Sequence, residues 1–312
     1  MMELSVVIPV YNEVENVKPL YNELKEVLDE LNKSYEIIFV DDGSSDGTYD
    51  KLLEIHSQDK SVKIIRLRKN FGQTLAIKAG FDYATGKVII TLDGDMQNDP
   101  RDIPDLLQYI TDYDVVCGWR KHRKDSFFLR TIPSKIANFI ICKITGLKLH
   151  DFGSTFRAYK KEILNELVLY GELHRFLPAI LAQNGAKIKE IPIHHRKRPS
   201  GKPKYGLSRI FRVIPQIIAL QFFYSGFVSP VTTIGLGGLL SILLGIISGI
   251  GTIWLKFAKG IDMTGNPLLY LTILLMLIGT TFIVLSLMGE LIVSAHYHSH
   301  RQRPYEIKQI HE

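Results

Sequence analysis

Residues 87–97 read Lys87-Val88-Ile89-Ile90-Thr91-Leu92-Asp93-Gly94-Asp95-Met96-Gln97, an apolar run that ends in two carboxylates and an amide. The β-branched residues at its start are typical of a short strand that is buried on both faces. Such strands occur in parallel sheets covered by helices, where ligands bind beyond the carboxyl ends of the strands. The oxygen-bearing side chains therefore begin where a sheet of this kind binds its ligand.

The chain around this run alternates between strand patterns and helix patterns, which predicts an α/β fold with a mostly parallel sheet covered on both faces. Asp41-Asp42 and Asp93-Gly94-Asp95 each follow a strand, so we expect both to face one cleft. The expected strands are Leu4–Val10, Tyr35–Val40, Val62–Leu67 and Lys87–Leu92, with a fifth beginning at Val115 and Val116; the expected helices are Asn16–Leu31, Thr48–His56 and Thr74–Ala84.

Apolar residues make up 46% of the 312-residue chain, and residues 227–295 hold few charges. Val228–Leu255 and Leu268–Ala295 each exceed the ~20 apolar residues that cross a bilayer as a helix. With the short link Lys256–Pro267 they predict a transmembrane helical hairpin. Small residues allow helices to approach closely in a membrane. In the first span, Gly235, Gly238, Gly245 and Gly249 offer such residues.

Positive charge flanks the predicted hairpin on both sides, and the net charge is +6. A basic chain can bind nucleic acid, a phosphorylated ligand or an anionic membrane surface, and the position beside the apolar segments favours the last two. The link holds only Lys256 and Lys259, so the positive-inside rule predicts cytoplasmic termini and a cytoplasmic N-terminal domain. The flanking basic residues are Arg196, Lys197, Arg198, Lys202, Lys204, Arg209, Arg212, Arg301 and Arg303.

Two further segments, Phe127–Leu147 and Leu207–Phe223, mix apolar and basic residues. This pattern indicates an amphipathic helix lying in a membrane interface, although a surface helix packed on the core gives the same pattern. Their proximity to the spans favours the interface. We therefore expect a catalytic domain at 1–206 that includes an interface helix at about 127–147. A juxtamembrane helix at 207–226, the hairpin at 227–295 and a cytoplasmic tail at 296–312 would follow.

Asp93, Asp95 and Gln97 offer hard oxygen ligands of the kind that bind Mg2+ or Mn2+. A diphosphate could complete the coordination shell, and the metal would then neutralise the leaving group as a glycosyl bond breaks. An Asp-x-Asp pair by itself often caps a helix, but the position at a strand end with Gln97 following favours the metal. Asp41-Asp42-Gly43-Ser44 predicts a strand-to-helix turn with an N-cap, and a carboxylate there could also bind a nucleobase or ribose.

Four segments occur in order along the chain: Ile8-Pro9-Val10-Tyr11-Asn12-Glu13, Val40–Thr48, Lys69-Asn70-Phe71-Gly72-Gln73 and Leu92–Gln97. Together they resemble the family 2 glycosyltransferases of the GT-A fold. The sequence is more similar still to the polyprenyl-phosphate glycosyltransferases, a group that includes dolichol-phosphate mannosyltransferase and bacterial undecaprenyl-phosphate glucosyltransferases. The tail Arg303-Pro304-Tyr305 after a two-span hairpin also resembles this group, so the resemblance covers nearly the whole chain.

The resemblance implies a role for each matching residue. Pro9, Tyr11, Glu13, Asp42, Asn70, Gln73 and Asp93 would bind the nucleotide, while Asp93, Asp95 and Gln97 would hold the metal. Arg120, Arg130, Ser134 and Arg198 would bind the acceptor phosphate, and Asp95, Asp151 and Arg120 would be catalytic. Arg198 precedes Gly201-Lys202-Pro203-Lys204-Tyr205, in which Pro203 replaces the small hydroxyl residue usual in the family.

The implied reaction is an inverting transfer from a nucleotide-diphosphate sugar to a polyprenyl phosphate, such as undecaprenyl phosphate, at the cytoplasmic membrane face. A UDP-sugar such as UDP-glucose is the first choice of donor, and GDP-mannose is the alternative. Asp151 could be a general base or could orient the acceptor, although a phosphate with a second pKa near ~6 is already ionised. The expected partners are the lipid bilayer and a possible second copy of the chain, not nucleic acid. A non-catalytic membrane scaffold is the remaining alternative.

Overall fold

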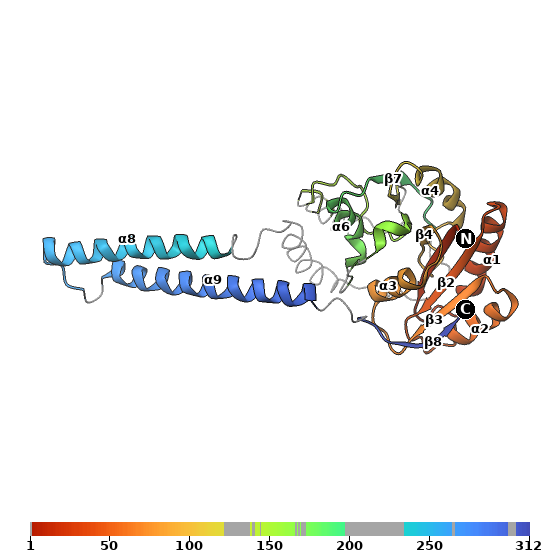
Figure 1. Ribbon diagram of the computed structural model, residues 1–312, viewed down its shortest axis with the longest axis horizontal. Helices are drawn as coiled ribbons and strands as arrows, with labels where there is room; N and C mark the ends of the chain where they lie inside the picture. The colour runs from red at the N-terminus through yellow and green to blue at the C-terminus, as the bar shows by residue number, and fades with distance from the viewer. Residues whose placement is uncertain are drawn as a thin grey trace. The chain divides into compact units, whose positions relative to one another are not determined.

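The computed structural model describes residues 2–121, 138, 141–143, 145–165, 167, 169, 173–196, 234–263, 266–298 and 304–312. The chain forms two compact units, one made of Met1–Tyr224 with Arg303–Glu312 and the other of Ser225–Gln302. The first unit, hereafter the head, is an α/β domain that contains both termini (Figure 1). The second unit is a helical hairpin.

An eight-stranded mixed sheet forms the centre of the head, in the order β7-β5-β6-β4-β1-β2-β3-β8 (Figure 1). β1, β2, β3 and β4 run parallel, and β5 runs parallel to β7. β6 is antiparallel to both of its neighbours, β4 and β5, so the carboxyl ends of β4 and β5 meet the start of β6 at one edge. The strands are β1 (Leu4–Val10), β2 (Tyr35–Asp41), β3 (Val62–Leu67), β4 (Val88–Thr91), β5 (Val115–Trp119), β6 (Arg157–Lys160), β7 (Ile188–Pro192) and β8 (Ile307–His311).

Helices cover both faces of the sheet because successive strand residues point to opposite sides. In β1, Val6 and Ile8 pack with one set of helices, whereas Val7 packs on the other side. The first set is α1 (Val17–Glu30), α2 (Thr48–Gln58) and α4 (Ile103–Tyr109); the second is α3 (Gln73–Tyr83) and α6 (Leu177–Gln183). Short 3₁₀ turns complete the head at Pro100–Asp102, Lys161–Leu164 and Leu173–Arg175. The predicted α/β fold is confirmed.

The apolar spacing of α1 explains how this layer forms. Val17, Leu20, Leu24 and Leu28 recur every three or four residues and are fully buried, so one stripe of the helix faces the sheet. On the opposite face, α3 approaches β1 so closely that a Cβ on Gly80 would lie 2.1 Å from Val7 Cγ1. A glycine is therefore required where the two elements touch.

Three strands of the sheet were not in the sequence-based prediction: β6, β7 and β8. Each has only four or five residues, and β6 and β8 pair antiparallel outside the strand–helix alternation. β8 lies beyond the hairpin in sequence, in the segment expected to be a tail, and pairs with β3. The sheet therefore contains strands from both sides of the hairpin.

Side-chain contacts fasten the C-terminal segment to the head. Tyr305 is buried, and its hydroxyl donates to Asp82 Oδ2 at 2.6 Å. The Tyr49 hydroxyl donates to Gln309 Oε1 at 2.8 Å, and the Arg68 amide donates to the Glu306 carbonyl at 3.0 Å. These contacts come from α3, from α2 and from the residue that follows β3, so β8 is an integral edge strand.

The second unit consists of α8 (Leu236–Lys259) and α9 (Pro267–His298), both long and apolar enough to cross a membrane. α8 ends at Gly260 in a left-handed conformation (φ +66°), later than the expected end at Leu255. Lys256 and Lys259 therefore lie in the last turn of α8, where cations interact favourably with the helix dipole. The expected link Lys256–Pro267 is correspondingly shorter.

Small residues bring α8 and α9 together. A Cβ on Gly238 would lie 2.8 Å from the Gly279 carbonyl oxygen, and one on Gly245 would lie 3.1 Å from Met276 Sδ. The Ser241 hydroxyl donates to the Leu275 carbonyl at 2.8 Å across the same interface. The expected close packing is confirmed at these glycines, and at Gly249, where a Cβ would lie 3.3 Å from Thr272.

The amphipathic helices predicted near the membrane fall largely outside the described residues. Of the interface helix expected at about 127–147, the described residues Asn138, Ile141–Lys143 and Thr145 are helical. Gly146 and Leu147 are not, and Gly146 has a left-handed φ of 69°, so the helix ends at Thr145, two residues before the expected end. The juxtamembrane helix at 207–226 lies wholly outside them and stays a prediction.

The docking of the C-terminal segment predicts a graded loss of stability. Tyr305→Phe removes one buried hydrogen bond and should cost about 1 kcal/mol, whereas Tyr305→Ala also empties the ring site and should cost about 3–5 kcal/mol. Thermal unfolding of the purified full-length protein measures both, with Tm falling roughly 2–4 °C per kcal/mol. Lys308→Ala is the matched control, because Lys308 is exposed on β8, three residues further along the chain. A Tyr305→Ala protein that melts with the wild type would contradict this docking.

Candidate active site

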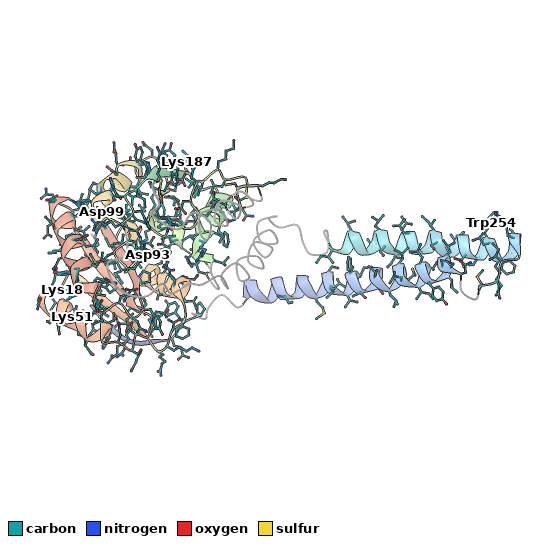
Figure 2. All side chains as sticks on the ribbon, turned by 180° about the vertical axis from the view of Figure 1, so that it is seen from behind. Lys18, Lys51, Asp93, Asp99, Lys187 and Trp254 are labelled. Atoms are coloured by element: carbon teal, nitrogen blue, oxygen red, sulfur yellow. The ribbon has the colours of Figure 1, made fainter. Side chains whose placement is uncertain are left out.

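The four sequence segments that carry the family resemblance lie side by side at one edge of the sheet. We call them the Tyr11 loop (residues 9–13), the Asp42 loop (41–48), the Gln73 loop (69–73) and the Asp93 loop (93–97). They follow β1, β2, β3 and β4, which are adjacent and parallel in the order β4-β1-β2-β3. Asp93 lies well apart from Lys18 of α1 and Lys51 of α2 (Figure 2).

Reciprocal hydrogen bonds join the Tyr11 and Asp42 loops. The Asn12 amide donates to Ser44 Oγ at 2.9 Å, and the Ser45 amide donates to Asn12 Oδ1 at 2.9 Å. Asn12 adopts a positive φ of 50°, a conformation that asparagine tolerates better than most residues. Glu13 is buried and accepts from Asn16 Nδ2 at 2.6 Å. Tyr11 is half-buried at the same strand end.

Asp42 connects the Asp42 loop to the Gln73 loop. Its Oδ1 accepts from the Phe71 amide at 2.7 Å and its Oδ2 from the Gly72 amide at 2.9 Å. Burial raises the pKa of Asp42 to about 6; the two amide hydrogen bonds oppose this rise, and the neighbouring Asp41 adds to it. Each carboxylate oxygen keeps a second lone pair for a ligand hydroxyl. The predicted nucleotide-binding aspartate is thus also the anchor of the neighbouring loop.

Gly43 and Gly94 allow the loops to touch. Gly43 has a φ of +74°, and a Cβ there would lie 2.6 Å from the Lys69 carbonyl carbon. A Cβ on Gly94 would lie 2.7 Å from Val10 Cγ1. The Asp42 loop therefore abuts the Gln73 loop beside the exposed Asn70, and the Asp93 loop abuts the end of β1 next to Pro9.

Gln73 Nε2 donates to Asp93 Oδ1 at 2.8 Å and joins the Gln73 and Asp93 loops. Since the Asp93 loop also touches β1, the four loops form a closed ring of contacts. The Asp41-Asp42 and Asp93-Gly94-Asp95 clusters, which were expected to face one cleft, are thus linked through the Gln73 loop.

The Asp93 loop can hold a divalent cation. Asp93, Asp95 and Gln97 are all half-buried, and the loop turns tightly because Asp95 Oδ1 accepts from the Gln97 amide at 3.1 Å. Met96 adopts a left-handed φ of 59° within this turn. Among the described residues no three His, Cys, Asp or Glu side chains gather to hold a metal. Two carboxylates and one amide oxygen fit Mg2+ or Mn2+ only if ligand oxygens, such as those of a diphosphate, complete the shell.

Arg120 and Asp151 form a second half of the site, beyond the end of β5. Arg120 Nε lies 2.7 Å from Asp151 Oδ2, and Arg120 Nη2 lies 2.9 Å from Oδ1, so the pair is bidentate. Both side chains are largely buried, and the Gly153 amide also donates to Asp151 Oδ1 at 3.0 Å. The sequence predicted both residues separately, and the structure brings them together. A planar guanidinium held in this way has a fixed orientation.

Glu190 of β7 supports this pair and escaped the sequence analysis. Its Oε1 accepts from the amides of His150 and Asp151 at 2.9 and 3.0 Å. The His150 ring stacks on Trp119, with centroids 4.2 Å apart. No local pattern marks Glu190, because only its partners across the sheet reveal its role.

Arg196 is the second residue whose role the sequence did not reveal. It lies in the head, within the expected domain bounds, 2.6 Å from Asp99 Oδ1 and 2.8 Å from Glu23 Oε2. Its amide also donates to the Gln97 carbonyl at 2.8 Å. The segment that leads toward Arg198 is therefore fixed beside the Asp93 loop. Arg130, Ser134 and Arg198 themselves lie outside the described residues.

Comparison with known proteins agrees with this architecture. Residues 5–168 match the model of glycosyl transferase family 2. The chain is 37% identical over 318 residues to the dodecaprenyl-phosphate galacturonate synthase of Rhizobium johnstonii. The aligned region covers 99% of this chain and 93% of that protein.

Solved structures are similar to the head at low sequence identity. Glucosyl-3-phosphoglycerate synthase from Mycobacterium tuberculosis with Mn2+ and UDP-glucose matches with a TM-score of 0.55 at 16% identity, covering 70% of this chain and 79% of that one. Its complex with Mg2+ and UDP matches with a TM-score of 0.53 at 15% identity over the same shares. The head therefore has the GT-A fold of glycosyltransferases. The chain belongs to glycosyl transferase family 2 and is an enzyme of that family.

The buried carboxyl of Asp42 predicts a pH-dependent stability. Its pKa is about 6 in the folded protein against an ordinary 3.8, so the native state holds this proton more tightly. Between these pH values the contribution of Asp42 to the free energy of unfolding should fall as pH rises, by about 3 kcal/mol at most. Asp42→Asn removes this titration. Urea unfolding at pH 4.5, 5.5 and 7 measures the free energy of unfolding of the wild type and of Asp42→Asn. The wild-type value minus the variant value should decrease toward pH 7. A difference that stays constant or increases would contradict the raised pKa.

Proposed function

We propose that the protein transfers a sugar from a UDP-sugar to a polyprenyl phosphate at the cytoplasmic face of a membrane. The observation that carries this proposal is the closed ring of four loops around Asp93, with the Arg120–Asp151 pair at the end of β5. The name of the 37% identical relative supports a polyprenyl phosphate acceptor and adds galacturonate to glucose as a candidate sugar. GDP-mannose is the alternative donor, by resemblance to the mannosyl members of the family.

The ring of loops is the donor half of the proposed site. Tyr11, Glu13 and Asp42 would bind the base and ribose, together with Pro9, Asn70 and Gln73. Asp93, Asp95 and Gln97 would hold Mg2+ or Mn2+ against the diphosphate. When bound, the cation neutralises the charge that develops on the leaving diphosphate. The hydrogen bond from Gln73 fixes Asp93 in place for this task.

The Arg120–Asp151 pair is the acceptor half. Arginine carries five N–H donors in a planar fork, and this geometry suits bidentate contact with a phosphate as well as with the Asp151 carboxylate. Asp151 accepts from Arg120 and Gly153, an arrangement that suits a positioning residue better than a proton acceptor. A phosphate monoester is largely ionised at neutral pH and needs no base. Arg130, Ser134 and Arg198 would complete the phosphate site.

The proposed reaction is a single displacement. A phosphate oxygen of the acceptor attacks the anomeric carbon on the face opposite the diphosphate. The new carbon–oxygen bond forms as the bond to the diphosphate breaks, so the anomeric configuration inverts. The products are a polyprenyl-phosphate sugar and UDP, and Arg120 holds the nucleophile in line throughout.

The chain topology supports the proposed membrane arrangement. β3 precedes the hairpin and β8 follows it, and both belong to one sheet. If α8 and α9 each cross the bilayer, the two flanks lie on one side, and the basic flanking residues favour the cytoplasm. The catalytic domain at 1–206 and the segment 296–312 would then both be cytoplasmic.

Loss of an Asp93-loop carboxylate should abolish transfer without unfolding the head. We expect Asp95→Ala to lower kcat/KM about 10²- to 10⁴-fold, because a bound cation contributes several kcal/mol to the transition state. Radiolabelled sugar transfer to polyprenyl phosphate in detergent measures the loss, and Asp112→Ala, exposed on the surface, is the control. Excess chelator should stop the wild type, and Mg2+ or Mn2+ should restore it. Full activity in chelator would exclude the metal role.

The paired arrangement predicts how Asp151 variants behave. Asp151→Asn should raise the acceptor KM about 10-fold while the pH profile of kcat keeps its shape, because Arg120 loses its orientation. Arg120→Lys should act in the same direction, and the double variant should cost less than the sum of the two. A kcat loss near 10³-fold in Asp151→Asn, with the acidic limb of the profile gone, would instead identify Asp151 as a general base.

A further inference from the structure

Two buried hydroxyl groups beside the candidate site have no hydrogen-bond partner within the described part of the chain. Ser154 is 1% exposed and Thr155 is 7% exposed. Neither Ser154 Oγ nor Thr155 Oγ1 has a hydrogen-bond partner among the residues that the structure describes. A buried hydroxyl without a partner is costly, so native proteins rarely keep one unless a ligand or water satisfies it.

The sheet topology puts these hydroxyls between the two halves of the site. β6 lies between β4 and β5 and runs antiparallel to both, so the residues that precede β6 lie at the carboxyl ends of β4 and β5. β4 leads into the Asp93 loop, and β5 leads into Arg120. Residues 153–155 therefore bridge the donor and acceptor halves.

Contacts on both sides confirm this placement. Toward β4, the hydroxyl of Thr91 donates to the Thr155 carbonyl. Thr91 is the last residue of β4 and precedes Asp93 by two residues. Toward the acceptor half, a Cβ on Gly153 would lie 3.1 Å from Arg120 Nη2. Ser154 lies between these two anchors in the chain.

Arg157 holds the segment rigidly. This arginine is 1% exposed, and it donates to the carbonyls of Phe152 and His174, each at 2.8 Å. The residues that flank Ser154 and Thr155 are thus fixed before any ligand arrives. Fixed hydroxyls can discriminate between ligands, because they cannot turn to suit a wrong one.

We propose that Ser154 and Thr155 bind the hydroxyl groups of the donor sugar and help determine which sugar is transferred. The inference rests on the proposed function, in which the sugar must lie between the leaving diphosphate and the acceptor phosphate. A sugar there brings ring hydroxyls, or the carboxylate of a uronic acid, to two protein hydroxyls that can each donate and accept. A site built to hydrogen-bond a substrate rejects analogues that lack the matching group.

Ser154→Ala and Thr155→Val test the proposal by a pair of binding measurements on the full-length protein. The donors are UDP-glucose and UDP-galacturonate, and the reference ligand is UDP with no sugar. We expect each variant to bind the preferred UDP-sugar about 3- to 10-fold more weakly, the effect of one lost hydrogen bond, with UDP affinity unchanged. The ratio of transfer rates for the two donors should shift as well.

Stability separates a ligand contact from a structural one. Removing a hydroxyl that has no protein partner should leave the melting temperature of the ligand-free protein unchanged or higher. Ser5→Ala is the matched control, because Ser5 is equally buried but donates to Glu36 at 2.5 Å and lies at the other end of β1. Ser5→Ala should lower the melting temperature and leave the ratio of transfer rates unchanged.

Three outcomes would overturn the inference: unchanged UDP-sugar affinity in both variants, an equal loss for UDP and UDP-sugar, or a melting temperature that falls as far as in Ser5→Ala. Each would appear in a protein whose wild type still transfers sugar. A wild type that transfers no sugar to polyprenyl phosphate would contradict the proposed function itself.

Discussion

The buried carboxylate of Asp42 is the contact on which the arrangement of the candidate site depends. It accepts hydrogen bonds from the amides of Phe71 and Gly72, and these bonds hold the Gln73 loop in place. From this loop the Gln73 side chain donates to Asp93. Burial makes the charged form costly, as the raised pKa records, and the two amides offset part of that cost. One side chain at the end of β2 therefore organises the loops after β3 and β4.

The same edge of the sheet explains how one fold can bring two substrates together. The donor loops follow the parallel strands β1 to β4, whereas Arg120 follows β5 on the far side of the antiparallel β6. Because β6 runs antiparallel to β4 and β5, its first residues lie at this edge of the sheet, beside the last residues of its neighbours. The segment before β6 thus lies between the proposed donor loops and Arg120. In the proposal, the leaving group and the nucleophile bind on either side of this segment.

The hairpin is an insertion in the chain of the head, because β8 returns to pair with β3. Close packing through Gly238 and Gly279 joins α8 and α9 into a single hairpin. An even number of crossings is the only arrangement that permits both flanks of a membrane-spanning insertion to share a sheet. Connectivity therefore requires both flanks to lie on one side of the membrane, and the choice of the cytoplasmic side in the proposal rests on charge.

Much of the fold could be predicted because its first half is strongly periodic. β1 and β3 match the expected bounds Leu4–Val10 and Val62–Leu67, and α1, α2 and α3 differ from theirs by two residues or fewer. β6, β7 and β8 could not be predicted, since short strands acquire their identity from partners distant in sequence. Asp93 was recognisable because it follows a strongly patterned strand, whereas Arg120 was identified through the family resemblance. The Arg120–Asp151 pairing and the roles of Glu190 and Arg196 needed the three-dimensional structure.

The mass of the lipid product tests the central proposal most directly. Purified protein in nanodiscs would be given undecaprenyl phosphate, Mg2+ or Mn2+, and either UDP-glucose or UDP-galacturonate. The account predicts a lipid that keeps one phosphate and gains one glycosyl residue, with UDP released in equal amount. A lipid that gains a sugar together with a second phosphate, or a lipid that remains unmodified with every nucleotide sugar supplied, would contradict it.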